Sequence, residues 1–161
     1  MYPSSTATNA AALDSGTTDD AVAGKLTQSG QNFATTVTVG DYAVITTAVG
    51  GFAVRSYGLV TAVDSDTTLS ISGPGLPATG TGGLSASGTV YSIIAAADLS
   101  KCVLSGATFT TNVQPGDVVC NTTTNLNYKV ASVTNDTTII LEGDNFGILN
   151  GDGFFILSDR G

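Results

Sequence analysis

The sequence predicts an all-β protein built from two divergent copies of one small barrel- or sandwich-like β unit, with an extended N-terminal arm. Apolar blocks recur in the same order in both halves of the chain, and β-branched and aromatic residues dominate them. No window keeps apolar residues at helical spacing for the length of a helix. We expect the arm over residues 1–24, copy one over residues 25–97 and copy two over residues 98–161.

The first 24 residues are expected to form a flexible or extended arm. They are mostly Ser, Thr, Ala, Asn, Gly and Asp, with Leu13 and Val22 as isolated larger apolar residues. Such a segment buries too little apolar surface to offset its own ordering entropy. Two interpretations stay open: a frayed terminus, or an arm that becomes ordered across a neighbouring subunit.

Three matching blocks indicate the duplication. The blocks of copy one are Phe33-x-x-x-Val37-x-x-Gly40-Asp41, Val60-x-x-Val63-x-x-Asp66-Thr67-Thr68-Leu69-x-Ile71 and Gly88-x-x-Tyr91-x-Ile93-Ile94. The blocks of copy two, in the same order, are Phe109-x-x-x-Val113-x-x-Gly116-Asp117, Val130-x-x-Val133-x-x-Asp136-Thr137-Thr138-Ile139-x-Leu141 and Gly151-x-x-Phe154-x-Ile156-Leu157. Copy two is six residues shorter between the first two blocks and seven residues shorter between the last two. Three ordered matches favour an internal repeat, with the deletions in loops.

Each block predicts short strands joined by tight turns. Gln114-Pro115-Gly116-Asp117 is typical of a type II turn, because Pro presets φ at its second position and Gly supplies positive φ at its third. A strand over Val118-Val119-Cys120 follows, and Asn135-Asp136 and Ser65-Asp66 favour tight hairpins. The apolar positions expected in the core are Val37, Val60, Val63, Leu69, Ile71, Val113, Val130, Val133, Ile139 and Leu141.

A unit of this kind resembles small β-barrels of the Src-homology-3-like type, from each Gly-Asp turn onward. The long stretch from Gly73 to Gly88 departs from a compact barrel. A β-sandwich shared by both copies is the competing shape. Units this small are marginally stable alone, which favours packing between copies and association between chains.

Catalytic chemistry has few candidates in this sequence. Histidine is absent, which removes the commonest general base near neutral pH and every nucleophile–His arrangement. Turn chemistry accounts for the carboxylate pairs Asp64/Asp66 and Asp19/Asp20. The stretch from Glu142 to Gly153 offers oxygen ligands for calcium, but without the spacing of known calcium loops. We therefore expect a non-enzyme with no catalytic, cofactor-binding or metal-binding residues and no cofactor.

Charge and hydropathy exclude further classes. The net charge is −8 and the five basic residues are isolated, so direct nucleic-acid binding is not expected. No apolar stretch reaches the ~20 residues of a membrane-spanning helix. A secretory signal is also absent, so we expect cytoplasmic synthesis with Cys102 and Cys120 as small, buried, reduced thiols. Charged residues are only 11% of the chain, which indicates either a surface covered by neighbours or an exposed Thr- and Ser-rich sheet.

The duplicated Phe-x-x-x-Val-x-x-Gly-Asp and Val-x-x-Val-x-x-Asp-Thr-Thr blocks, the low charge and the polar arm resemble small virion structural proteins of tailed bacteriophages. Among these, capsid decoration (cement) proteins are the most similar. The resemblance implies a homo-oligomer, often a trimer, that binds the major capsid protein or other virion proteins through multivalent contacts and its arm. Two alternatives stay open: a neck, tail or fibre component, and a carbohydrate- or surface-binding module that uses Tyr42, Phe52, Tyr57 and Tyr128.

Overall fold

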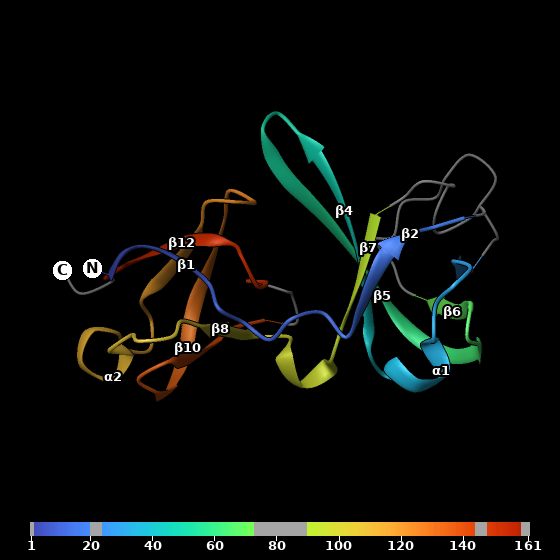
Figure 1. Cartoon of the computed structure of the whole chain (residues 1–161). Coiled ribbons are helices and arrows are strands. Elements are labelled where there is room, and N and C mark those ends of the chain that lie inside the picture. Colours follow the sequence, from blue (N-terminus) through green and yellow to red (C-terminus); the bar gives the residue numbers. More distant parts are fainter. Residues whose placement is uncertain (1, 20–23, 73–89, 144–147, 159–161) are drawn as a thin grey trace. The chain divides into compact units, whose positions relative to one another are not determined.

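The computed structural model describes residues 2–19, 24–72, 90–143 and 148–158, which form two separate compact units (Figure 1). The N-terminal unit comprises Ala12–Ala96, and the C-terminal unit comprises Met1–Ala11 together with Ala97–Gly161. Nearly all of their regular structure is β-strand, so the all-β prediction is confirmed. Within the described residues, no helix is long and apolar enough to cross a membrane.

The N-terminal unit is one six-stranded antiparallel sheet with the strand order β2-β7-β4-β5-β6-β3. Its elements are β2 (Asp14–Thr17), β3 (Lys25–Thr27), α1 (Phe33–Thr36), β4 (Tyr42–Val49), β5 (Phe52–Ser65), β6 (Thr68–Ser72) and β7 (Val90–Ile94). The single-turn helix α1 precedes β4, and a short 3-10 helix η1 (Ala96–Asp98) leads into the next unit.

The C-terminal unit is a second six-stranded antiparallel sheet with the order β1-β12-β9-β10-β11-β8. Its elements are β1 (Tyr2–Thr6), β8 (Lys101–Val103), α2 (Phe109–Asn112), β9 (Val118–Asn121), β10 (Leu126–Asn135), β11 (Thr138–Leu141) and β12 (Gly153–Leu157). The two strand orders are the same once repeated blocks are matched. The predicted duplication is therefore confirmed at the level of topology.

Hydrogen bonds repeat between the copies as well. The Gly40 amide donates to the Val60 carbonyl, and the Gly116 amide donates to the Val130 carbonyl, both at 2.9 Å. The Phe33 and Phe109 amides donate to the Asp66 and Asp136 carbonyls, both at 3.0 Å. The Gly-Asp turns and the Asp-Thr turns thus occupy equivalent places in the two units.

The predicted turn at Gln114-Pro115-Gly116-Asp117 is confirmed. The Asp117 amide donates to the Gln114 carbonyl at 3.1 Å, and Gly116 has a φ of 94°. Because an L side chain is strained at that φ, glycine is the residue this turn requires. The Asp117 carboxylate also accepts a hydrogen bond from the Gln114 amide at 3.0 Å, so the aspartate closes the turn from both sides.

Each unit has its own hydrophobic core, which favours two barrel-like units over one shared sandwich. Eight of the ten apolar positions expected in the cores are buried; they are Val37, Val60, Leu69, Ile71, Val113, Val130, Ile139 and Leu141. Val63 and Val133 are only partly buried and pack against the edges of these cores. Their strands β5 and β10 change register next to them, which turns their side chains away from full burial.

The six residues that copy two lacks do not fall in a loop. In copy one they lengthen the hairpin of β4 and β5, and β5 alone spans 14 residues. A two-stranded hairpin can grow by whole cross-strand pairs without disturbing the register near its base. The other length difference falls in residues 73–89, outside the described residues.

The N-terminal segment differs from the expected flexible arm. Residues 2–9, here called strap one, pair through β1 with β12 of the C-terminal unit. Residues 13–19, here called strap two, pair through β2 with β7 of the N-terminal unit. An unpaired sheet edge offers a row of backbone donors and acceptors, and these satisfy the polar backbone of a segment that has few apolar side chains.

The two straps are equivalent, which extends the duplication into a region where the sequence did not reveal it. Ser5 lies opposite Phe154, and Gly16 lies opposite Tyr91, the residue that matches Phe154 in copy one. Farther along, Ala7 and Thr18 are both buried, with 2% and 3% of their surface exposed. The repeating unit is therefore a strap plus a curled sheet.

Candidate functional site

Residues 46–55 of β4 and β5 form a two-stranded hairpin, here called the ribbon, that extends beyond the other strands of the N-terminal unit (Figure 1). β7 pairs with β4 only as far as Ile45, and β6 pairs with β5 only from Leu59 onward. In the described strand pairings, the strands of the ribbon therefore have only each other as neighbours.

The sequence folds locally into this hairpin because Gly50 and Gly51 lie between two strand-forming runs. Their φ values are 61° and 86°, the left-handed pair that a two-residue type I′ turn requires. Such a turn matches the twist of the flanking strands and permits direct pairing of Val49 with Phe52. This Gly-Gly pair is the sequence signal that could have revealed the ribbon.

Two exposed apolar side chains lie close together on one strand of the ribbon. Phe52 has 41% of its surface exposed and Val54 has 47%. Neither belongs to the core of the N-terminal unit, and the equivalent hairpin of the C-terminal unit lacks the residues that form the ribbon. An extension that adds exposed apolar surface without adding to the core is typical of an interaction surface.

The aromatic residues expected to stack on sugars do not form one exposed set. Only Phe52 is exposed, whereas Tyr42 and Tyr57 are partly buried. Tyr128 packs partly against the core of the C-terminal unit. This arrangement removes the platform of exposed aromatic rings on which the carbohydrate-binding alternative depended.

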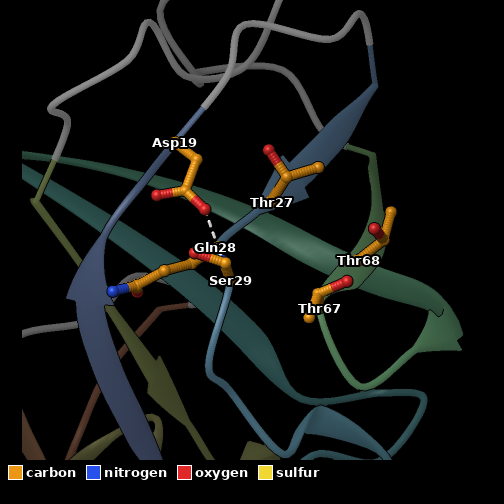
Figure 2. Close-up of a pocket in the computed structure, with 6 residues that line it drawn as sticks. All are labelled: Asp19, Thr27, Gln28, Ser29, Thr67 and Thr68. Atoms are coloured by element: carbon orange, nitrogen blue, oxygen red, sulfur yellow. Dashed lines mark hydrogen bonds between the residues drawn. The ribbon is translucent and has the colours of Figure 1, made fainter.

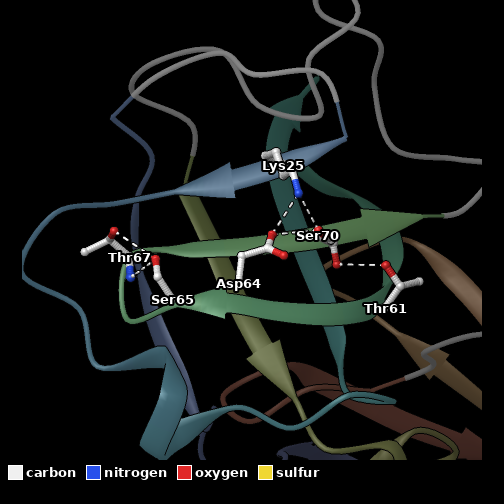
Figure 3. Close-up of polar contacts among 6 residues, drawn as sticks. All are labelled: Lys25, Thr61, Asp64, Ser65, Thr67 and Ser70. Atoms are coloured by element: carbon white, nitrogen blue, oxygen red, sulfur yellow. Dashed lines mark hydrogen bonds and ion pairs between the residues drawn. The ribbon is translucent and has the colours of Figure 1, made fainter.

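The carboxylates of Asp64 and Asp66 have separate partners, and Figure 3 shows those of Asp64. The Lys25 ammonium donates to Asp64 at 2.8 Å and the Ser70 hydroxyl donates at 2.6 Å, and these bonds hold the pKa of Asp64 below its usual value. Asp66 instead accepts a hydrogen bond from the Ala34 amide at 3.2 Å. The two residues tie β3, β5 and α1 together and do not form an acid–base pair.

The stretch from Glu142 to Gly153 contains a third Gly-Asp turn. Gly151 has a φ of 87°, and the Asp152 carboxylate accepts hydrogen bonds from the Leu149 amide at 3.0 Å and the Asn121 side chain at 2.9 Å. Turn chemistry thus accounts for Asp152, which is 2% exposed. Residues 144–147 lie outside the described residues, and the described ones contain no group of three or more potential metal-ligating side chains.

A polar cavity of about 230 Å³ lies between strap two, β3 and the turn from β5 to β6 (Figure 2). Its lining residues are Asp19, Thr27, Gln28, Ser29, Thr67 and Thr68. The carboxylate of Asp19 already accepts a hydrogen bond from the Ser29 amide. Asp20, the other member of the predicted carboxylate pair, lies outside the described residues.

Both cysteines are buried and unpaired, as the sequence predicts. Burial raises the pKa of the Cys102 thiol to about 12, with a smaller contribution from the negative charge of Asp152. Burial also raises the pKa of Cys120. A protonated, enclosed thiol is a poor nucleophile, which fits a packing role for both residues.

Comparison with known proteins gives no relative for this chain: no protein-family model, no curated protein and no solved structure matches it.

Proposed function

We propose that the chain is a non-enzymatic virion protein of a bacteriophage that decorates and stabilises the capsid. The observation that carries this proposal is the ribbon, which adds exposed apolar surface to a protein in which only 11% of the residues are charged. The contact would bury Phe52 and Val54 against the major capsid protein. Copies would also associate with one another, as a trimer or another symmetric oligomer.

Multivalency supplies the binding energy in this account. One ribbon offers a small apolar contact, which alone gives weak attachment. Copies that associate with one another and attach to the same shell hold each contact at high effective concentration. If the protein binds the assembled shell and not the separated capsid subunits, it raises the resistance of the shell to heat, because a ligand stabilises the state to which it binds.

The ribbon takes the place of the N-terminal arm in the proposal. Strap one and strap two pair with strands of their own chain, so the proposal places attachment to the capsid on the ribbon. A neck, tail or fibre component could use the same surface. The test below separates these locations by the particle to which the protein binds.

The test compares binding of four proteins to purified capsids and, separately, to purified tails and necks, measured by co-sedimentation. The temperature at which the capsids lose their contents is measured as well. The first is the wild type, and the second has Phe52→Ser and Val54→Ser. The third lacks residues 47–49 and 52–54, which leaves Gly50-Gly51 as the turn between Thr46 and Arg55. The fourth is the control Leu126→Ser, which removes an exposed apolar side chain from the equivalent hairpin of the C-terminal unit.

We expect all four proteins to fold, because the ribbon lies outside both cores. Both ribbon variants should bind capsids at least tenfold more weakly, while the control binds as the wild type does. If the wild type binds tails or necks and not capsids, the capsid assignment is wrong. If ribbon variants and wild type attach equally well, the ribbon is not the attachment surface.

A further inference from the structure

Strap one serves a unit from which it is far removed in sequence. The Asn9 side chain donates to the Lys101 carbonyl at 2.8 Å and accepts from the Val103 amide at 2.9 Å. The Thr8 amide donates to the Val103 carbonyl at 2.7 Å. In the sequence, the whole N-terminal unit separates strap one from β8. Strap one therefore belongs to the C-terminal unit without being part of that unit's continuous stretch of sequence.

Strap one joins both edges of the sheet that it serves. Through β1 it pairs with β12 at one edge, and through Thr8 and Asn9 it bonds with β8 at the other. Between them, Ala7 fills part of the core, and its carbonyl accepts a hydrogen bond from the Gly151 amide at 3.0 Å. The C-terminal unit without strap one would expose two sheet edges and a small apolar slot.

The contiguous segment before the C-terminal unit offers no substitute. Residues 96–98 form the 3-10 helix η1 and lead directly to β8. In the N-terminal unit, by contrast, strap two ends at Asp19 and β3 begins at Lys25, so strap and sheet are close in sequence. Only one of the two units therefore depends on a strand delivered from a distance.

The contacts of strap one require nothing particular to its own chain. They consist of backbone hydrogen bonds, of the ring contact between Tyr2 and Phe109 at 5.2 Å, and of the small side chains of Ala7, Thr8 and Asn9. The same segment of another copy makes these contacts equally well. Strap one is joined to strap two by residues 10–12, and strap two is held in the N-terminal unit. Strap one can thus leave its site while that unit stays folded.

We propose that the C-terminal unit is a strand acceptor, in which strap one of a second copy takes the place of the chain's own, so that copies join by strap exchange. Exchange between identical chains preserves every contact of the closed form, and its cost is the loss of one connection within a chain. The proposal goes beyond the proposed function and concerns the isolated protein. A failure to bind capsids would therefore leave it standing.

Disulfide trapping of the full chain tests this proposal. The Thr8 hydroxyl accepts a hydrogen bond from the Ser105 amide at 2.7 Å, so Thr8→Cys with Ser105→Cys places two thiols across the strap contact. The native Cys102 and Cys120 are buried and do not compete. The equivalent contact in the N-terminal unit, between Asp19 and the Ser29 amide, supplies the matched pair Asp19→Cys with Ser29→Cys.

Each variant is incubated at a series of concentrations, diluted, oxidised at once and separated under denaturing, non-reducing conditions. We expect the strap-one pair to give covalent dimers and larger species that increase with the concentration before dilution, at least tenfold above either single-cysteine variant. The strap-two pair should give closed monomers alone. Closed monomers at every concentration for strap one, equal multimers for both pairs, or no disulfide across the strap-one contact would each overturn the proposal.

Discussion

Tyr91 illustrates how one buried polar group constrains its neighbours in the N-terminal unit. Its hydroxyl donates to the Gln28 side chain at 2.7 Å, and burial raises its pKa. The Gln28 oxygen lies under Gly16 of strap two, where an added Cβ would approach it to 2.0 Å. Gly16 is therefore a glycine because Gln28 occupies the space that a side chain would need.

The C-terminal unit has Ser5, Leu104 and Phe154 at the three equivalent positions, so the duplication supplies a test. Gly16→Ser alone should displace Gln28 from the Tyr91 hydroxyl and lower the free energy of unfolding by about 1–3 kcal/mol. The triple variant Gly16→Ser, Gln28→Leu, Tyr91→Phe should lie near the wild type, because both partners are then replaced. Urea denaturation measures the free energy of unfolding of both variants. A Gly16→Ser variant that is as stable as the wild type, or a triple variant that is no more stable than Gly16→Ser, contradicts this account.

The Cys102 thiol gives a pH dependence with a definite sign. Its pKa is about 12 in the folded chain and about 8.5 in an unfolded one. The folded state therefore holds the proton more tightly. The stabilising contribution of the protonated Cys102 thiol is complete below pH ~8.5 and is lost as the pH rises toward 12.

We expect the free energy of unfolding of the C-terminal unit to fall between pH 8.5 and 11, and to fall less steeply in Cys102→Ala. Denaturation at several pH values, followed by a probe within that unit, gives both slopes. The Ala variant has a cavity in place of the sulfur, so its absolute stability is lower and only the slopes are compared. Equal slopes would show that the thiol does not contribute.

At the scale of elements, the Gly-Asp turn is the structural device that recurs, before β4, β9 and β12. In each turn the aspartate accepts a hydrogen bond from the backbone amide three residues earlier. Asp152 has an additional buried donor, the side chain of Asn121. The three turns should therefore differ in their contribution to stability.

Asp152→Ala should lower the free energy of unfolding more than Asp41→Ala does. The Asp152 change leaves the buried Asn121 side chain without this acceptor, whereas the Asp41 change removes the carboxylate acceptor of the exposed residue Thr38. Each donor left unsatisfied and buried costs about 1–3 kcal/mol. Thermal denaturation of the two variants, with probes in each unit, measures the order. Equal losses, or a larger loss for Asp41→Ala, would contradict the assigned role of Asn121.

These elements also show what the sequence could reveal. The Gly-Asp turns and the core valines were predictable, because turn chemistry and apolar spacing act over a few residues. The straps were not, since strap one has one fully buried apolar residue, Ala7, and one partly buried ring, Tyr2 on Phe109, and its other contacts are mostly backbone bonds to distant strands. Backbone pairing leaves little trace in the identity of the side chains.

The ribbon was missed for a different reason. The sequence shows that copy one is six residues longer, and a length difference between repeats usually falls in a loop. Gly50-Gly51 between two strand-forming runs was the local signal for a longer hairpin. The exposure of Phe52 and Val54 could not be read from spacing, because alternation alone does not say which face is covered.

At the scale of the whole molecule, the sequence of one strap-and-sheet unit is inserted between the strap and the sheet of the other unit. Strap one precedes the complete N-terminal unit, and the sheet that strap one serves follows it. Each unit has its own core and its own strap, so each contains the interactions it needs to fold. Both units are so small that the loss of one strand should lower the stability of the whole sheet.

Amide hydrogen exchange of the full chain with Ala7→Asp tests this arrangement most directly, with the exposed neighbour Thr6→Asp as the control. A buried carboxylate without compensation should displace strap one. We predict loss of protection in β1, β8 and β12 of the C-terminal unit, while β3 to β7 of the N-terminal unit keep theirs. Loss of protection in β3 to β7, or full protection everywhere, would show that strap one does not complete the C-terminal unit.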